Sequence, residues 1–366
     1  MNFETPLKSL HEKAGARLGE YFGCLLPESF GQGEQEHQMA REAVALFDTC
    51  YRAYVYLTGP DRVRFLNAIA TNDVKSLGDG QGSQGLLLNP QGHILAEIEC
   101  CALGDSILVL SHALVREQTV QWLEKYIIMD DVTVEDATGR IGSVALEGPG
   151  TASLLHSVCG LKLEAMPELA HREVVIGAAT GRAIRRSHFG EIGVEIVATR
   201  EALPAVWQTL AEAARQAGGV PIGYAVLNAL RLQAGVPWFS YDFDDQRIPH
   251  EAGLETSHIS YTKGCYTGQE IVERVRSRGH VNRKRIGLQF DGSAPPRAET
   301  KLLYNGKEVG HVTSAAYSPA RRRAIGIGYL RHEHTAPGSR VQYEAGTAEV
   351  IELPLPEITA LRATRP

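Results

Sequence analysis

The sequence KGCYTGQE places a single thiol, Cys265, where it could do chemistry. Thr267 and Glu270 have the T-x-x-E spacing of a capping box, which predicts a helix that begins at Gly268. Cys265 then lies just before the positive end of the helix dipole, and Lys263 lies two residues before the thiol. Both features favour the thiolate, the nucleophilic and metal-binding form. The alternative is a small cysteine packed in a turn, because free cysteines are usually buried, and the neighbouring residues do not decide between these two roles.

The cysteine spacing argues against a metal centre built by this chain alone. The six cysteines are spread along the chain without a C-x-x-C pair, whereas zinc and iron–sulfur sites need clustered ligands. No metal site is therefore predicted, and cluster chemistry at one thiol would be shared with a partner. This spacing is typical of reduced cytosolic thiols. The cysteines are Cys24, Cys50, Cys100, Cys101, Cys159 and Cys265.

Composition narrows the class of protein further. The chain has 366 residues, and chains beyond about 250–300 residues usually split into domains. It is 43% hydrophobic and 22% charged, and no apolar run approaches the ~20 residues needed to cross a bilayer. The N-terminal segment lacks the marks of a secretory signal. We therefore expect a soluble, cytoplasmic protein, and the net charge of -6 disfavours nucleic acid as a partner.

The elements that must position these residues begin with a first α+β module. Residues 53–57 alternate as a strand, and residues 58–61 carry helix-start signals. Apolar runs follow, broken by turn sequences at 89–92 and 104–105. Helical spacing over 115–126 then precedes another strand. The order β-α-β-β-α-β suggests a split βαβ module.

A second module resembles the first in its order of elements, and the sequence pattern changes after it. The strand, Gly-Pro and helix pattern at Gly59-Pro60 returns at Gly148-Pro149, which indicates an internal duplication. From about residue 283 the chain shows short strands between glycine turns, typical of a small β-barrel. The fold class predicted is α+β, with two related modules and a C-terminal barrel. The domains expected are 1–140 with an N-terminal extension, 141–282 with the cysteine-motif helix, and 283–366, and the two modules are allowed to exchange segments.

Five phrases, found in order over almost the whole chain from about residue 40, resemble the tetrahydrofolate-binding glycine-cleavage T-protein family, the aminomethyltransferases. They are GPDRVRFLNAIATNDV, LLLNPQGHIL, SHFGEIGVEI, VLNALRLQAGVPWFSYDFDDQRIPHEAGL and VGHVTSAAYSPARRRAIGIGYL. Within that family, K-G-C-Y-x-G-Q-E resembles the mark of the YgfZ branch, folate-binding proteins implicated in iron–sulfur cluster assembly and repair. Here it is complete from Lys263 to Glu270. The resemblance implies three domains in a ring around a central tetrahydrofolate channel.

The resemblance also assigns folate contacts to three residues. The acid of Y-T-G-E-D-G that grips the pterin ring falls on Glu191, and a carboxylate suits a pterin edge that offers an amino group beside a ring N–H. The arginine of R-L-E-A-G falls on Arg231, and Asn89 matches the L-L-N-x-x-G turn. Without the resemblance, Glu191 would be a surface acid, Arg231 a helix-surface residue, and Asn89 an ordinary turn residue.

The chain departs from the family where the transferase acid is expected. The phrase G-G-I-x-D-D, whose aspartate approaches the reactive folate nitrogen, reads here GHILAE, so Ala96 and Glu97 replace the two acids. Two family tyrosines are replaced by Gln84 and His188. Because a displacement of about 1 Å can cost ~100-fold in rate, these changes favour folate binding over transferase activity.

Three hypotheses about function follow. The first is a tetrahydrofolate-binding, YgfZ-like protein that supports maturation or repair of iron–sulfur enzymes, with Cys265 as the working thiol, Lys263 beside it, and iron–sulfur client proteins as partners. The second is a folate-dependent aminomethyltransferase that uses Glu97. The third is a folate-binding scaffold without catalysis. The basic run over 274–285 is either a solvated surface or a site for an anionic group such as the glutamate tail of folate. No nucleic acid or membrane partner is predicted.

Overall fold

The computed structural model describes residues 3–356, which form two compact units. Each unit is assembled from separate stretches of the chain. The first contains residues up to 88, residues 95–226 and residues 257–267, and the second contains residues 89–94, residues 227–256 and the chain from 268 onward. Within the described range, no helix is both long and apolar enough to span a membrane.

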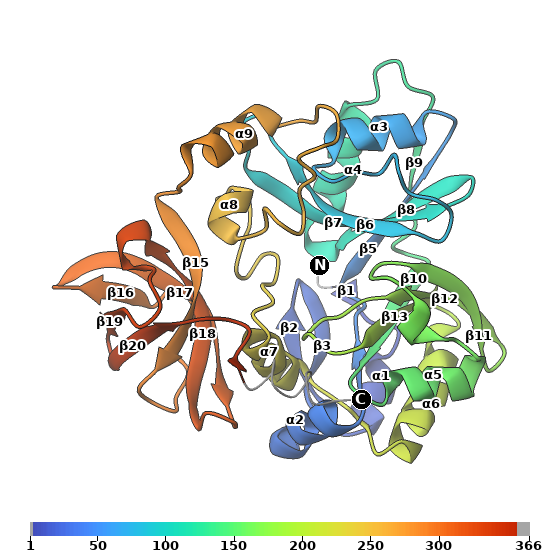
Figure 1. Cartoon of the computed structure of the whole chain (residues 1–366). Coiled ribbons are helices and arrows are strands. Elements are labelled where there is room, and N and C mark those ends of the chain that lie inside the picture. The colour runs from blue at the N-terminus through green and yellow to red at the C-terminus, as the bar shows by residue number, and fades with distance from the viewer. Residues whose placement is uncertain (1–2, 357–366) are drawn as a thin grey trace. The chain divides into compact units, whose positions relative to one another are not determined.

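The first unit contains a five-stranded sheet with the strand order β6-β7-β8-β5-β9. Two helices, α3 (Arg62–Ile69) and α4 (Arg116–Lys125), pack on one face of it (Figure 1). The element order is β-α-β-β-β-α-β, one strand more than expected, because both turns, at 89–92 and 104–105, separate strands of the same sheet. The strands are β5 (Arg52–Thr58), β6 (Gly82–Leu88), β7 (Ile94–Leu103), β8 (Ser106–His112) and β9 (Thr133–Asp136).

A six-stranded sheet follows, with the order β11-β12-β13-β10-β4-β14. Its outer face is covered by α5 (Thr151–Cys159) and α6 (Leu203–Gln216). Strand β4 precedes the first module along the chain, yet it pairs with β10 of the second. The strands are β4 (Ala45–Asp48), β10 (Ile141–Glu147), β11 (His171–Ile176), β12 (Ala179–Arg185), β13 (Gly193–Thr199) and β14 (Val220–Pro221).

The inner faces of these two sheets pack against each other, so the order of layers is helix, sheet, sheet, helix. The apolar part of this interface includes Tyr54, Cys101, Leu108, Ile184 and Val197. Because side chains alternate along a strand, neighbouring residues point instead to the helices on the outer faces. Charged side chains that point into the space between the two sheets must therefore find their partners there.

Smaller elements precede the first module. The three-stranded sheet β1-β3-β2 comes from the N-terminal extension. Short 3₁₀ turns lie at η1 (Ala113–Val115), η2 (Leu163–Ala165) and η3 (His332–His334). The N-terminal elements are β1 (Phe3–Glu4), α1 (Lys8–Lys13), β2 (Arg17–Tyr21), β3 (Cys24–Ser29) and α2 (Gly33–Glu42).

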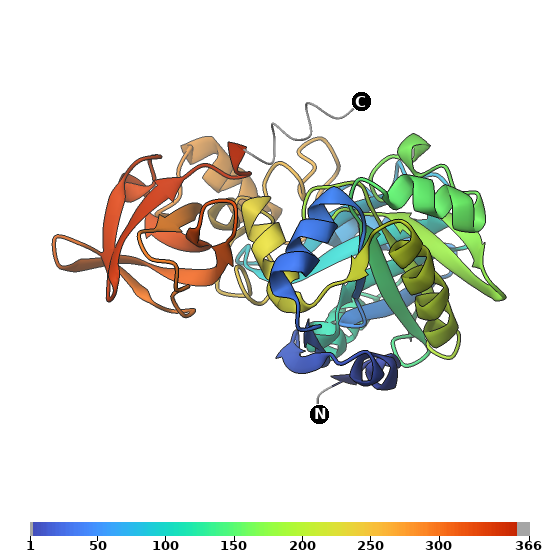
Figure 2. The same cartoon turned by 90° about the horizontal axis from the view of Figure 1, so that it is seen from below.

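The second unit contains a closed barrel of six strands in the order β15-β18-β17-β16-β19-β20. Its strands are coloured orange to red in Figure 2. The closed order of strands confirms the predicted C-terminal barrel, whose interior is filled by apolar side chains such as Leu288, Phe290 and Val312. The strands are β15 (Arg283–Phe290), β16 (Lys301–Tyr304), β17 (Lys307–Ser318), β18 (Arg323–Arg331), β19 (Arg340–Tyr343) and β20 (Gly346–Ile351).

Three helices complete the description: α7 (Tyr224–Gln233), α8 (Pro249–Ala252) and α9 (Gln269–Arg278). The predicted capping box at α9 is wrong. Gly268 is the N-cap, with a φ of 84° and no side-chain hydrogen bond. Glu270 pairs instead with Arg274, one turn along the helix. The left-handed conformation of Gly268, which glycine adopts without steric cost, sets the start of the helix.

Candidate functional site

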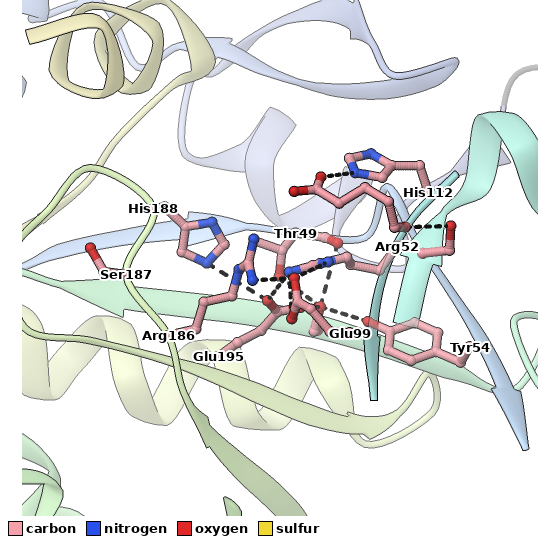
Figure 3. Close-up of polar contacts among 12 residues, drawn as sticks. Thr49, Arg52, Tyr54, Glu99, His112, Arg186, Ser187, His188 and Glu195 are labelled. Carbon is pink, nitrogen blue, oxygen red and sulfur yellow. Dashed lines mark hydrogen bonds and ion pairs between the residues drawn. The ribbon is translucent and has the colours of Figure 1, made fainter. Parts of the chain in front are cut away.

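A buried ion-pair network joins the two sheets of the first unit (Figure 3). Arg52 on β5 donates to Glu99 on β7 and to Glu195 on β13, each over 3.0 Å. All three side chains are at most 2% exposed. Arg186 is a second partner of Glu99. Two guanidinium groups thus face two carboxylates, which is the balance that buried charge requires.

Three hydroxyl groups extend the network (Figure 3). The hydroxyl of Ser143 donates to Glu195 over 2.7 Å, and the Tyr54 hydroxyl donates to Ser143 over 2.6 Å. Thr49 also lies 2.7 Å from the Ser143 oxygen. Burial, together with the nearby Glu195, raises the pKa of Tyr54 well above its usual value. Tyr54 therefore remains a donor, and the chain of hydrogen bonds runs from Tyr54 through Ser143 to Glu195.

Glu97 has a different environment from Glu99 on the same face of β7. Its two carboxylate oxygens lie 3.0 Å from Nε2 of His258 and 3.3 Å from Nε2 of His112. Burial opposes ionisation, but the hydrogen bonds from His112 and His258 outweigh it and hold the pKa of Glu97 well below its usual value. Burial also lowers the pKa of His112, so a neutral imidazole donates to an ionised carboxylate.

Ala96, the residue before Glu97, stands where the family phrase has an acid, and strand geometry explains why no acid is found there. Ala96 is 1% exposed and points into the apolar core beneath the helices, together with Ile98 and Cys100. An acid at this position would be buried without a partner, at a cost of several kcal/mol (about 2–7 for an unpaired polar group). Of the two family acids, only the one at Glu97 faces the polar interior here, with 15% of its side chain exposed.

Glu147, which sequence reasoning missed, organises the loop that carries Glu191. Its carboxylate accepts hydrogen bonds from the backbone N–H groups of His188 (2.5 Å), Phe189 (3.0 Å) and Glu191 (2.8 Å), and from the Ser187 hydroxyl (2.9 Å). Burial raises the pKa of Glu147 to about 7, although these four donors act in the opposite direction. The sequence signal that could have identified Glu147 is its position as an acid at the end of an otherwise apolar strand, β10.

His188, which stands in the place of a family tyrosine, is a neutral donor or acceptor at this site. Burial, with Arg186 and Arg52 nearby, holds its pKa well below the usual value. Its Nε2 is buried without a hydrogen-bond partner among residues 3–356. This nitrogen lies 3.7 Å from Oε2 of Glu195, which is too long for a hydrogen bond. Figure 3 shows the ring beside the ion-pair network.

Lys263 fastens the loop that carries Cys265. Its ammonium group donates to the carbonyls of Asn67, Ala70 and Asn72, where helix α3 ends, and lies 5.2 Å from the Tyr266 ring centroid. Burial lowers the pKa of Lys263 to about 8. Lys263 is therefore committed to backbone acceptors.

Cys265 differs from the other five cysteines in its exposure. Four of the others are buried and Cys159 is half-buried, and burial raises the pKa of all five. Cys265 is the exposed thiol of the chain. The described residues contain no group of three or more histidine, cysteine, aspartate or glutamate side chains placed to hold a metal ion.

The other two predicted folate contacts lie in the second unit. Arg231 is fully buried and forms an ion pair with Asp242, and its guanidinium lies 4.4 Å from the Trp238 ring centroid. Its Nη2 is buried and has no hydrogen-bond partner in the described part of the chain. Asn89 uses its side-chain oxygen to accept from the backbone N–H groups of Gln91 (3.0 Å) and His93 (2.9 Å).

These features define a class of protein: two α+β modules share an acid-lined inner face and are accompanied by a six-stranded barrel. The GCVT N-terminal domain family matches residues 7–259, and the glycine cleavage T-protein C-terminal barrel domain matches residues 283–355. The chain therefore belongs to the glycine cleavage T-protein family, which confirms the resemblance at the level of the superfamily.

Known relatives match over more than nine-tenths of their length. The aminomethyltransferase of Halothermothrix orenii is 28% identical over 356 residues, which cover 96% of this chain and 99% of that protein. The aminomethyltransferase of Prochlorococcus marinus (strain MIT 9303) is 30% identical, with 94% of each chain covered. The crystal structure of glycine cleavage system aminomethyltransferase T from Bartonella henselae superposes with a TM-score of 0.88, at 25% identity over 98% of this chain and 99% of that one.

Proposed function

We propose that this protein binds tetrahydrofolate and transfers a one-carbon unit to or from it, in the manner of its aminomethyltransferase relatives. The observation that carries the proposal is Glu97: an ionised, 15% exposed carboxylate held by His112 and His258 on the inner face of β7. An oriented carboxylate can stabilise positive charge or take a proton at a nitrogen beside it. Tetrahydrofolate would supply that nitrogen.

The donors and acceptors of the site fit a reduced pterin. Glu191 offers a carboxylate on a loop fixed by Glu147, and a carboxylate matches the paired N–H donors of a pterin edge. His188 has an unpartnered ring nitrogen within the described residues. A folate contact for Arg231, which lies in the second unit, rests on the resemblance alone. In this proposal Glu191 and His188 hold the pterin, and Glu97 faces the reacting nitrogen.

Calorimetry and product release together test this proposal. Glu191→Gln is expected to weaken tetrahydrofolate binding about tenfold or more, because a charge-assisted bidentate contact is lost. Glu97→Gln is expected to bind within a few-fold of wild type but to release the one-carbon product from an aminomethylated carrier about 100-fold more slowly. Glu201→Gln, at an exposed acid, is the matched control. Wild-type binding without any product would remove the transferase assignment.

A second candidate function rests on the loop around Cys265. Lys263 holds this loop to the end of α3 and the thiol remains exposed, an arrangement that suits a thiol offered to another protein. In this reading the chain is a YgfZ-type factor that binds folate and supports maturation or repair of iron–sulfur enzymes through Cys265. A soft thiolate suits transient contact with cluster iron or sulfur.

The two candidates differ in what Cys265→Ala changes. If the protein is a transferase, Cys265→Ala keeps folate binding and product release. If it is a cluster factor, Cys265→Ala keeps folate binding but abolishes recovery of an oxidatively damaged iron–sulfur enzyme in a purified assay, while neither protein releases product. Cys159→Ala, at a half-buried thiol, controls for loss of any cysteine.

A further inference from the structure

Glu97 is the inner end of a hydrogen-bonded row of side chains that reaches the surface of the first unit. Nε2 of His258 lies 3.0 Å from one carboxylate oxygen of Glu97, and Nδ1 of the same ring lies 2.7 Å from the Ser257 hydroxyl. Glu97 has 15% of its side chain exposed and His258 is buried, whereas Ser257 is exposed. One imidazole therefore connects the candidate acid to a hydroxyl at the surface.

Hydrogen bonds within the first unit fix the backbone that carries this imidazole. The Thr71 hydroxyl donates to the His258 carbonyl over 2.6 Å, and the Ser260 N–H donates to the Thr71 carbonyl over 3.1 Å. The side-chain amide of Gln84, which replaces a family tyrosine, donates to the Ser257 carbonyl over 3.4 Å. The contacts with Thr71 and Gln84 set the place of the ring beside Glu97.

The protons of the row all point toward Glu97. An ionised carboxylate can only accept, so Nε2 of His258 must carry a proton and donate it to Glu97. In the neutral ring Nδ1 is then the acceptor, and the Ser257 hydroxyl must donate to Nδ1. Both distances lie within the reach of proton transfer, about 2.6–3.2 Å between heavy atoms. This arrangement is set to deliver a proton inward.

His112, which bonds the other oxygen of Glu97, has different surroundings (Figure 3). The residue is 5% exposed, and its ring centroid lies 5.4 Å from the ring centroids of both Phe22 and Tyr51. Packing among aromatic rings restrains an imidazole. His112 therefore serves to orient the carboxylate.

We propose that Ser257 and His258 form a proton relay that acts through Glu97, an inference that rests on the transferase function proposed above. In the inward step, the Ser257 hydroxyl passes its proton to Nδ1 of His258, Nε2 passes its proton to Glu97, and Ser257 takes a proton from solvent. Glu97 then protonates the amine nitrogen that leaves the one-carbon unit. One proton has moved from solvent to the leaving amine.

An outward step returns the relay to its starting state. After the inward step the His258 ring carries its proton on Nδ1, and Nε2 is free to accept. When the folate nitrogen bonds to the carbon, it becomes positively charged and releases its proton to Glu97, which passes it to Nε2. The Nδ1 proton goes to the Ser257 oxygen as the hydroxyl proton leaves to solvent. One proton enters and one leaves in each turnover, so Glu97, His258 and Ser257 end as they began.

Product release from an aminomethylated carrier, with calorimetry for tetrahydrofolate, tests the relay in the full chain. His258→Ala is expected to release product about 100-fold more slowly. It should bind tetrahydrofolate within a few-fold of wild type, because the ring acts on a proton and not on folate. Added imidazole should restore part of the rate, since a free ring can carry the same proton. Thermal melting shows whether the variant is folded.

Ser257 allows a second test at an exposed position. Ser257→Ala should slow product release about tenfold, because one hydrogen bond of the relay is lost. Ser257→Thr, which keeps the hydroxyl, should release product at close to the wild-type rate. Ser76→Ala, at an exposed serine of the same unit, is the control and should behave as wild type does.

Failure of the relay and failure of the proposed function give different results. If wild type releases product and Glu97→Gln is slow, normal release by His258→Ala and Ser257→Ala would overturn the relay alone. Slow release by His258→Ala with weakened folate binding and no rescue by imidazole would also overturn it, because the ring would then only shape the site. Absence of product from wild type would overturn the transferase function and the relay with it.

Discussion

Replacing Arg52 by methionine should destabilise the first unit strongly. The Arg52 guanidinium is 2% exposed and is 3.0 Å from one oxygen each of Glu99 and Glu195. Methionine removes the charge and keeps most of the chain length. Glu99 would retain Arg186, whereas Glu195 would retain only the Ser143 hydroxyl and the more distant His188. Breaking a buried pair costs about 3–5 kcal/mol, and the surviving contacts place the expected loss at the lower end, about 3 kcal/mol.

Urea unfolding followed by tryptophan fluorescence measures this loss. The chain has three tryptophans, and a Trp238→Phe background leaves Trp122 and Trp207, which both belong to the first unit. The control is Arg64→Met, which removes the ion pair of an arginine with a 67% exposed side chain and Asp130 (2.8 Å). Exposed pairs contribute at most about 1 kcal/mol, so the control should change the free energy of unfolding little.

A double variant separates a lost attraction from a charge left unpaired. Adding Glu195→Gln to Arg52→Met removes the orphaned carboxylate, so part of the loss, about 1–2 kcal/mol, should be recovered. A loss below about 1 kcal/mol for Arg52→Met, or two single changes that simply add, would refute the reasoning that this network is tightly coupled.

Three further predictions concern single positions in the first unit. Lys263→Met should lower the free energy of unfolding by about 1–3 kcal/mol. It should also speed amide hydrogen exchange near residues 67–72, because three carbonyls there lose their donor. Lys75→Met, at an exposed lysine, should change neither quantity. Gly80→Ala should destabilise by about 1–3 kcal/mol in thermal melts, because φ is 80°, a conformation that L side chains rarely adopt. Gly139→Ala, with open space and a φ outside the left-handed region, is the comparison. His171 has a folded pKa of about 4 against roughly 6.5 unfolded, so the unfolded chain binds more protons between these values and stability falls as pH drops through that window. His171→Gln should flatten this slope, and an unchanged slope would contradict the assignment.

The sequence pattern predicted the elements well where their contacts are local. Strand β5, helix α3 and helix α4 follow from alternation, turn residues and helical spacing. Pairing between distant segments could not be predicted. Strand β4 pairs with β10 of the second sheet, about a hundred residues further along the chain. Backbone hydrogen bonds form this pairing, and they do not depend on the residue types in either strand. The capping box failed for a related reason: Glu270 had an alternative partner in Arg274.

The candidate site was predictable residue by residue only in part. Glu97 and Glu191 were assigned from resemblance, and their folate roles stay predictions. Arg52, Glu147 and Glu195 were missed, although each is a charged residue inside an apolar strand. Such residues are rarely buried without a partner, so they mark a polar interior. Which residues become partners depends on how the two sheets pack, and the sequence of a single strand does not determine that packing.

The acids between the sheets fall into two groups that differ in what neutralises them. Glu99 and Glu195 face arginines and are at most 2% exposed, so their charge is already cancelled within the fold. The donors to Glu97 and Glu147 are imidazole, backbone N–H and hydroxyl groups and not arginines. Only Glu97 of this second pair is also in reach of a ligand, since Glu147 is fully buried. A change at Glu195 should therefore reduce stability first, whereas a change at Glu97 should alter chemistry at a bound nitrogen with little loss of stability.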